Sequence, residues 1–224
     1  MVTKLYLVRH AEAEGNAREF FQGNIDTPLT EKGEMQLECL SARFAGIPLQ
    51  AVYSSPFQRA MLTAEAVNRA HQLPISPEYD LREINGGEWE GRAWADLPEE
   101  FPQQYALWTR KMWDFAAPQG DTMTDVYLRM QQMMEQIARE NAGKTVAVIS
   151  HGCALRNFLA FAEFHRIEGL PDVGWSDNTA VSLVEFDCTA GTWKLIFKND
   201  STHLPPELST LRGSNWNHYD EEDK

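Results

Sequence analysis

Three short apolar segments of the chain are each followed by basic residues. The basic residues are Arg9 and His10 after residues 4–8, Arg59 shortly after residues 49–54, and His151 after residues 145–149. Buried strands have this composition, and ligands of open α/β sheets bind beyond the carboxyl ends of the strands. Two guanidinium groups and two imidazoles at one sheet edge could hold the oxygens of a phosphate group, and a neutral imidazole could attack its phosphorus.

The net charge of the chain makes this cluster of basic residues unusual. The formal net charge is -13, so the surface repels nucleic acids and anionic lipids, and we expect no nucleic acid and no membrane as partners. A phosphate site must then be a local positive pocket. Ser55-Pro56 is typical of a helix start and places Arg59 in the first turn, where the helix dipole favours anions. Gly152 would let the backbone come close to such a ligand.

Helical periodicity and capping residues predict four helices between the strands. They cover Thr30–Ala45 with Thr30 as N-cap, residues 55 to about 70 with Ser55 as N-cap, Thr122–Asn141, and residues 152 to about 162. Two late strands are predicted over 181–186 and 193–197. This alternation predicts an α/β fold of three layers, in which an open, mostly parallel sheet has helices on both faces.

The 224 residues fit one large domain with an inserted cap. Residues 86–120 carry four tryptophans and three prolines but no strand signal, so we expect them to form a helical cap over one edge of the sheet. We expect a single domain over residues 1–204 and a C-terminal tail over 205–224, which holds Trp216, Tyr219 and the acidic run 220–223.

Five ordered motifs together resemble the signature of the histidine phosphatase superfamily, which includes the cofactor-dependent phosphoglycerate mutases. They are Leu7-Val8-Arg9-His10-Ala11-Glu12 continuing to Asn16, Asp26-Thr27-Pro28-Leu29-Thr30, Ser54-Ser55-Pro56 with Arg59-Ala60, Leu81-Arg82-Glu83 with Gly87-Glu88-Trp89-Glu90-Gly91, and Ser150-His151-Gly152. The match covers roughly residues 4 to 200. It implies a phosphoglycerate mutase-like fold.

The resemblance also implies roles for individual residues. His10 would be the covalent nucleophile, Glu83 the general acid and base, and Arg9, Arg59 and His151 the groups around the phosphate oxygens. Substrate-binding positions are Asn16, Gln22, Gly23 and Gly152. No metal or other cofactor is implied, because arginines supply the positive charge. The predicted activity is therefore that of a metal-independent phosphomonoesterase acting on a small phosphorylated metabolite.

One residue departs from the superfamily signature and keeps other functions open. Ala11 stands where glycine is usual, and some phosphohistidine-directed members carry alanine there. The alternatives are a cofactor-dependent phosphoglycerate mutase, a protein phosphohistidine phosphatase, and a phosphate-binding regulatory module without turnover. A mutase needs extra cations in its cap, where this sequence has only Arg92, Arg110 and Lys111.

Cysteine usage and the N-terminus indicate the compartment. The three cysteines are widely spaced and form no zinc-type pair, and no signal peptide or membrane-spanning run is visible. We therefore predict a cytoplasmic protein. The aromatic tail leaves a homodimer open.

Overall fold

The computed structural model of the chain describes residues 1–213 and centres on one six-stranded sheet. Along the sheet the strands are β3 (Ile75–Pro77), β2 (Ala51–Ser54), β4 (Thr145–Ser150), β1 (Val2–Arg9), β5 (Val181–Asp187) and β6 (Thr192–Asp200). The pairs β1–β4, β2–β4 and β2–β3 are parallel, whereas β5 runs antiparallel to both β1 and β6. The predicted mostly parallel sheet is therefore confirmed.

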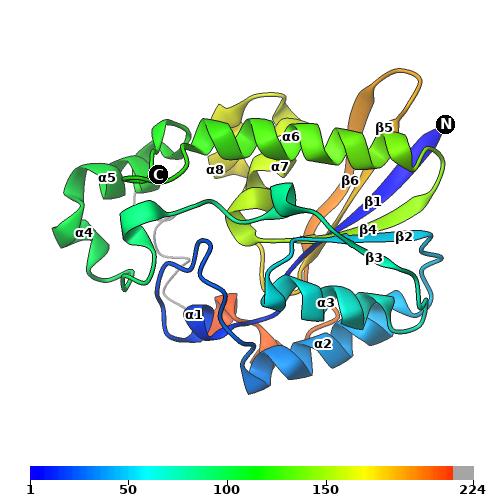
Figure 1. Ribbon diagram of the computed structural model, residues 1–224, viewed down its shortest axis with the longest axis horizontal. Coiled ribbons are helices and arrows are strands. Elements are labelled where there is room, and N and C mark those ends of the chain that lie inside the picture. The colour runs from blue at the N-terminus through cyan, green and yellow to red at the C-terminus, as the bar shows by residue number, and fades with distance from the viewer. Residues whose placement is uncertain (214–224) are drawn as a thin grey trace.

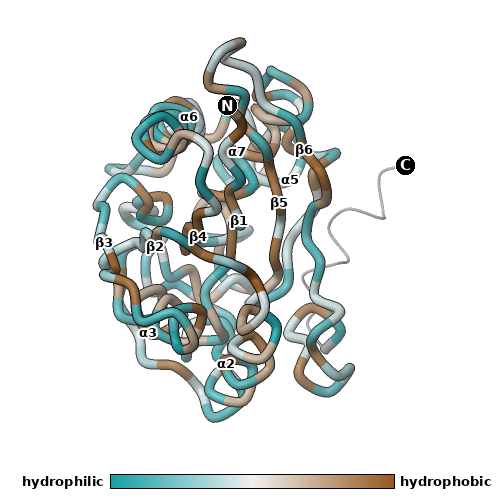
Figure 2. Tube along the Cα trace, turned by 90° about the vertical axis from the view of Figure 1, so that its right-hand side faces the viewer, coloured by the Kyte–Doolittle hydropathy of each residue, from teal (hydrophilic) through white to brown (hydrophobic). Residues whose placement is uncertain are grey.

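Helices cover both faces of this sheet (Figure 1). One face packs on α2 (Glu31–Phe44) and α3 (Gln58–Asn68), and the other packs on α6 (Met123–Glu140) and α7 (Gly152–Phe164). The strand β1 serves both cores because Leu7 faces α6 and α7 while Val8 faces α2 and α3. Figure 2 shows these hydrophobic strands between the helical layers. The predicted three-layer α/β fold is confirmed.

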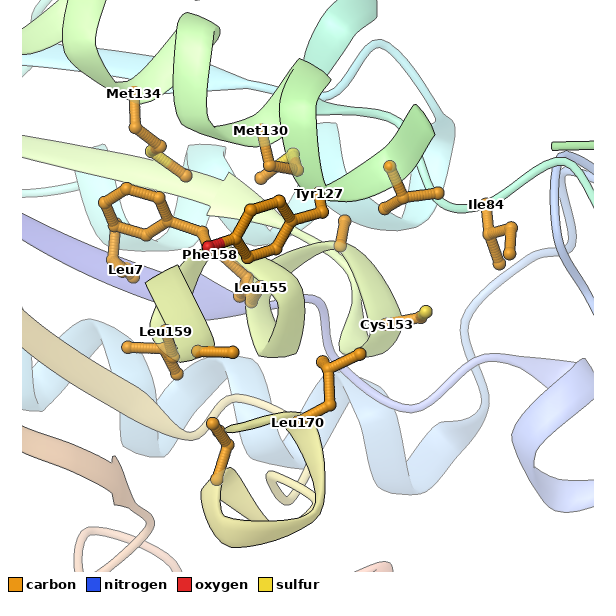
Figure 3. Close-up of a cluster of buried hydrophobic side chains, with 14 of the residues drawn as sticks. Leu7, Ile84, Tyr127, Met130, Met134, Cys153, Leu155, Phe158, Leu159 and Leu170 are labelled. Carbon is orange, nitrogen blue, oxygen red and sulfur yellow. The ribbon is translucent and has the colours of Figure 1, made fainter. Parts of the chain in front are cut away.

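The core under α6 and α7 ends at a pocket beyond the carboxyl ends of β1 and β4. Figure 3 shows Met130 and Met134 of α6 above Leu155 and Phe158 of α7, all of them buried. Ile84 and Cys153 belong to the same buried cluster and also line the pocket. Close packing of this core therefore fixes one wall of the pocket.

Residues 86–120 form short helical elements around an aromatic cluster. The elements are η2 (Gly87–Trp89), α4 (Leu97–Glu100), α5 (Pro102–Arg110) and η3 (Met112–Asp114). Trp89 is fully buried and packs edge-on against Phe21, with a ring-centroid distance of 5.6 Å, while Trp108 is 4.9 Å from Phe115. These aromatic side chains belong to the same buried cluster as the core under α6 and α7, so they join the cap to the domain. In Figure 1 the cap lies at the end of the molecule opposite the N-terminus.

The remaining described elements are short. They are α1 (Glu14–Ala17), η1 (Tyr79–Leu81), η4 (Ile167–Gly169), α8 (Leu170–Val173), η5 (Pro206–Leu208) and η6 (Leu211–Gly213). Residues 205–213 of the predicted tail lie against the domain, where Gln36 donates to the carbonyl of Leu208 at 2.7 Å. Trp216, Tyr219 and the acidic run lie outside the described residues. The domain boundary at residue 204 stays a prediction.

The predicted helix start at Ser55 is wrong. The helix α3 begins at Gln58, whose backbone N–H donates to Asp26 Oδ2 at 2.7 Å. The Ser55 hydroxyl instead contacts His151 Nε2 at 2.8 Å. The carboxylate of Asp26 therefore caps the first N–H of the helix, while the Ser55 hydroxyl lies against a buried imidazole. Arg59 still lies in the first turn.

Within residues 1–213 no helix is both long and apolar enough to cross a bilayer.

The helix α2 approaches the backbone of residues that follow β1 so closely that only glycine fits at the contact. A Cβ atom on Gly33 would lie 2.1 Å from the backbone oxygen of Glu12. We expect Gly33→Ala to lower the free energy of unfolding by about 1–3 kcal/mol, despite the helix preference for alanine, because a backbone atom cannot move away cheaply. Urea denaturation measures this change. The control Gly46→Ala, where a Cβ meets nothing within 4 Å, should stay within about 0.5 kcal/mol of the parent, and an equally neutral Gly33→Ala would contradict the packing argument.

Candidate active site

A pocket at the carboxyl ends of β1 and β4 brings together nearly all of the predicted site residues. Its lining includes Arg9, His10, Asn16, Gln22, Gly23, Arg59, Glu83 and Gly152. His151 lies directly behind this lining, with its ring 5.1 Å from the ring of His10 between centroids. The pocket encloses about 700 Å³ including its open mouth, which leaves room for a phosphate group and an attached organic group.

His10 is held as a neutral imidazole with one ring nitrogen engaged. It follows β1, is 3% exposed, and its Nδ1 lies 2.7 Å from the carbonyl oxygen of Ala11. A carbonyl only accepts, so Nδ1 carries the proton and Nε2 keeps its lone pair. Burial lowers the pKa of His10 well below 6.5, and the nearby charges of Arg59 and Arg9 lower it further. Nε2 is therefore an available nucleophile at neutral pH.

His151 follows β4 and is fully buried. Its pKa also lies well below 6.5, chiefly because of burial and then because of Arg59. While Nε2 contacts the Ser55 hydroxyl, Nδ1 is buried without a hydrogen-bond partner among the described residues. An unpaired buried nitrogen is costly, so the arrangement fits a ligand that supplies the missing partner.

Arg9 and Arg59 place two buried guanidinium groups in an acidic protein. Arg59 is 1% exposed and donates to the carbonyls of Gly23 at 2.8 Å and Ile25 at 2.7 Å, while Arg9 donates to the carbonyl of Ser176. Burial lowers the pKa of Arg59 to about 10, which is still well above neutral pH, and burial also lowers the pKa of Arg9. In the described part of the chain, the Nε atoms of both side chains are buried without a partner. They are unused donors for an anion.

Glu83 is anchored at the N-terminus of α7. Its Oε1 accepts from the backbone N–H groups of Ile84 and Ala154, both at 2.9 Å, and its Oε2 accepts from Cys153 at 3.0 Å. Arg129 supports the preceding backbone by donating to the carbonyl of Arg82 at 2.9 Å. The carboxylate is thus held in a fixed place on the pocket wall.

The predicted substrate-binding residues occupy positions that need small or polar side chains. Asn16 lies in α1, and its Oδ1 accepts from the backbone N–H of Ala13 at 3.1 Å. Gln22 Oε1 accepts from the hydroxyl of Thr27 at 2.9 Å. Gly23 has a φ of +50°, and a Cβ there would lie 2.3 Å from Glu90 Oε1. Gly152 lies so close to Arg9 that a Cβ would be 3.3 Å from its Nε. Gly23 therefore leaves room for the carboxylate of Glu90, and Gly152 leaves room for the guanidinium of Arg9.

Sequence reasoning missed a second group of residues around His10. Asn178 donates to the carbonyl of His10 at 2.8 Å, and Asp177 accepts from the backbone N–H groups of Asn178 and Thr210, both at 2.9 Å. Glu12 accepts from the hydroxyl of Thr210 at 2.8 Å. Residues 209–211 are thereby tied directly to Glu12 and, through Asp177 and Asn178, to the backbone of His10. In the sequence, the polar pair Asp177-Asn178 before β5 could have indicated a site residue. Residues 209–211 carry no motif that would have indicated their contacts with the site.

Residues 1–213 contain no cluster of three or more His, Cys, Asp or Glu side chains arranged to hold a metal ion.

Comparison with known proteins identifies the family. The family model of the histidine phosphatase superfamily (branch 1) matches residues 5–201. The chain belongs to this superfamily. Its relatives include phosphoserine phosphatase 1 of Hydrogenobacter thermophilus, which is 32% identical over 155 residues that cover 69% of this chain and 74% of the relative. The probable phosphoglycerate mutase GpmB of Escherichia fergusonii is 30% identical, and the alignment covers 93% of this chain and 99% of that protein.

A solved structure supports the same fold for this superfamily member. YhfR of Bacillus stearothermophilus superimposes with a TM-score of 0.85 at 31% identity, covering 90% of this chain and 98% of that protein. The predicted resemblance and the phosphoglycerate mutase-like fold are both confirmed.

The neutral buried histidines make stability depend on pH. An unfolded chain protonates histidine near pH 6.5, whereas folded His10 and His151 stay neutral well below that pH. As pH falls below about 6.5, the unfolded state binds more protons, so the free energy of unfolding decreases by up to about 1.4 kcal/mol per pH unit for each histidine. Chemical denaturation between pH 7 and 5.5 should show a smaller decrease in His151→Gln and in His10→Gln. The exposed His165→Gln should keep the parent's decrease, and unchanged pH dependence in both active-site variants would contradict neutral burial.

Proposed function

We propose that the protein is a metal-independent phosphomonoesterase that acts on a small phosphorylated metabolite through a phosphohistidine on His10. The observation that carries the proposal is the state of His10. Its Nδ1 is bound to the Ala11 carbonyl and its pKa is lowered, so Nε2 is unprotonated beside two buried arginines. The phosphatase names among the relatives support the same activity.

In the first step the Nε2 lone pair of His10 attacks phosphorus while the bond from phosphorus to the leaving oxygen breaks. Arg9, Arg59 and His151 hold the negative charge on the three equatorial oxygens, which is the main requirement of phosphoryl transfer. Asn16, Gln22, Gly23 and Gly152 complete the binding site. Glu83, when protonated, gives its proton to the leaving alkoxide.

In the second step water attacks the phosphohistidine, the N–P bond breaks, and Glu83 accepts a proton from the water. Three backbone N–H donors hold Glu83 in place for both steps at the N-terminus of α7. Phosphate then leaves and His10 is again a neutral imidazole.

A phosphoglycerate mutase is the rival function, since one relative carries that name. A mutase must hold a second anionic group, and therefore needs further cations at the pocket. Arg92 is paired with Glu100 at 3.3 Å, while Arg110 and Lys111 are exposed, and none of these three lines the pocket. The charge distribution therefore favours transfer to water. The cytoplasmic location and the homodimer stay predictions.

The test is phosphate release from a panel of phosphomonoesters in the presence of EDTA, with mutase activity assayed in parallel. We expect EDTA-resistant release that falls to background in His10→Ala, because the nucleophile is lost, and that falls about 10²–10⁴-fold in Glu83→Gln. His165→Ala, an exposed histidine outside the pocket, is the matched control and should keep the parent rate. Full activity in His10→Ala, or mutase activity without phosphate release, would refute the proposal.

A further inference from the structure

The part of the pocket beyond the phosphate-holding groups is lined by aromatic and aliphatic side chains. They come from segments that are far apart in the sequence and are Phe20, Ile84, Trp94, Trp108, Trp175 and Leu211. Three of these are tryptophans, whose large surfaces stabilise bound apolar groups. A leaving group that extends past the phosphate would contact this wall.

Few cations are available here for a second anionic group. Among the described lining residues, Arg9 and Arg59 are the only lysines or arginines, and both belong to the phosphate end of the pocket. Arg156 lies against the Trp175 ring but is not itself a lining residue. The acidic residue of the lining is Glu83, which offers a carboxylate on the leaving group no opposite charge. Burying an unpaired carboxylate here would cost free energy that an apolar group does not cost.

Contacts within the protein hold the side chains of this apolar wall in place. The rings of Trp108 and Trp175 are stacked at 6.0 Å with an interplanar angle of 25°, and the Arg156 guanidinium lies 4.4 Å from the Trp175 ring centroid on α7's side of the pocket. Leu211 is positioned through its segment, because Asp177 accepts from the N–H of Thr210 at 2.9 Å and from the hydroxyl of Ser209 at 2.5 Å. A preformed wall binds an apolar group with little ordering cost.

From this wall and its charge pattern, we infer that the preferred substrates are phosphate monoesters of uncharged apolar or aromatic alcohols, and not phosphorylated sugar acids or amino acids. This inference rests on the proposed phosphomonoesterase function. The apolar group of the alcohol would lie against the tryptophans and Leu211, while the phosphate lies between Arg9 and Arg59.

The first measurement compares kcat/KM for 2-phenylethyl phosphate, O-phosphoserine and 3-phosphoglycerate. The first two are esters of primary alcohols, so their ratio reflects binding of the organic group more than leaving-group chemistry. We expect 2-phenylethyl phosphate to be favoured at least about tenfold. A preference for either anionic substrate would overturn the inference, while phosphate release that still depends on His10 would leave the proposed function standing.

A charge variant tests the wall directly. Leu211→Lys places a cation on the wall and should shift the ratio toward O-phosphoserine by about tenfold or more, because it pairs the carboxylate. Ile196→Lys adds the same charge at an exposed position of β6 outside the pocket and should leave the ratio unchanged. Equal ratios in the parent and both variants would overturn the inference.

Binding separates failure of this inference from failure of the proposed function. Calorimetry with 2-phenylethylphosphonate and 3-phosphonopropionate needs no turnover, since neither compound has a P–O bond to a leaving group. Tighter binding of 2-phenylethylphosphonate is expected even in an inactive His10→Ala protein. Tighter binding of 3-phosphonopropionate would overturn the inference whether or not the enzyme hydrolyses phosphomonoesters.

Discussion

Two arginine side chains are buried where the central strands of an acidic protein end. Arg9 is 9% exposed and Arg59 is 1% exposed. Among the described residues, the ion pair that these two arginines make is that of Arg59 with Asp26, at 3.7 Å. Burial of cations with so little compensation is unfavourable, and backbone carbonyls such as that of Gly23 offset only part of the cost. A bound phosphate would supply the charge that is missing.

Both histidines are neutral because they are buried and because the two buried arginines lie close to them. Arg59 is among the largest causes that lower the pKa values of His10 and His151, after burial itself. Two neutral imidazoles can lie with ring centroids 5.1 Å apart without mutual repulsion. The neutral form is also the form that a nucleophile requires. The features that cost stability at acidic pH are therefore also those on which the proposed phosphoryl transfer depends.

The sequence predicted the parts of the site that depend on strand ends, because periodicity and strand order place Arg9, His10 and His151 at one sheet edge. It failed where tertiary contacts override local preference. Ser55 has the typical residue type of an N-cap, but its hydroxyl is taken by His151, a residue 96 positions away. The contacts of residues 209–211 with Glu12 and Asp177 were equally invisible, because they join distant segments through single hydrogen bonds. The short strand β3 has too few residues for a periodic signal.

The chemistry proposed for this site depends on a neutral His10, with its proton on Nδ1 and its lone pair on Nε2. Nitrogen-15 NMR of histidine-labelled protein reports the protonation state and tautomer directly, and a His10→Gln variant assigns the resonance. We expect His10 to show one neutral Nδ1–H tautomer that persists well below pH 6.5. A His10 ring that protonates near pH 6.5, or that carries its proton on Nε2, would contradict this expectation.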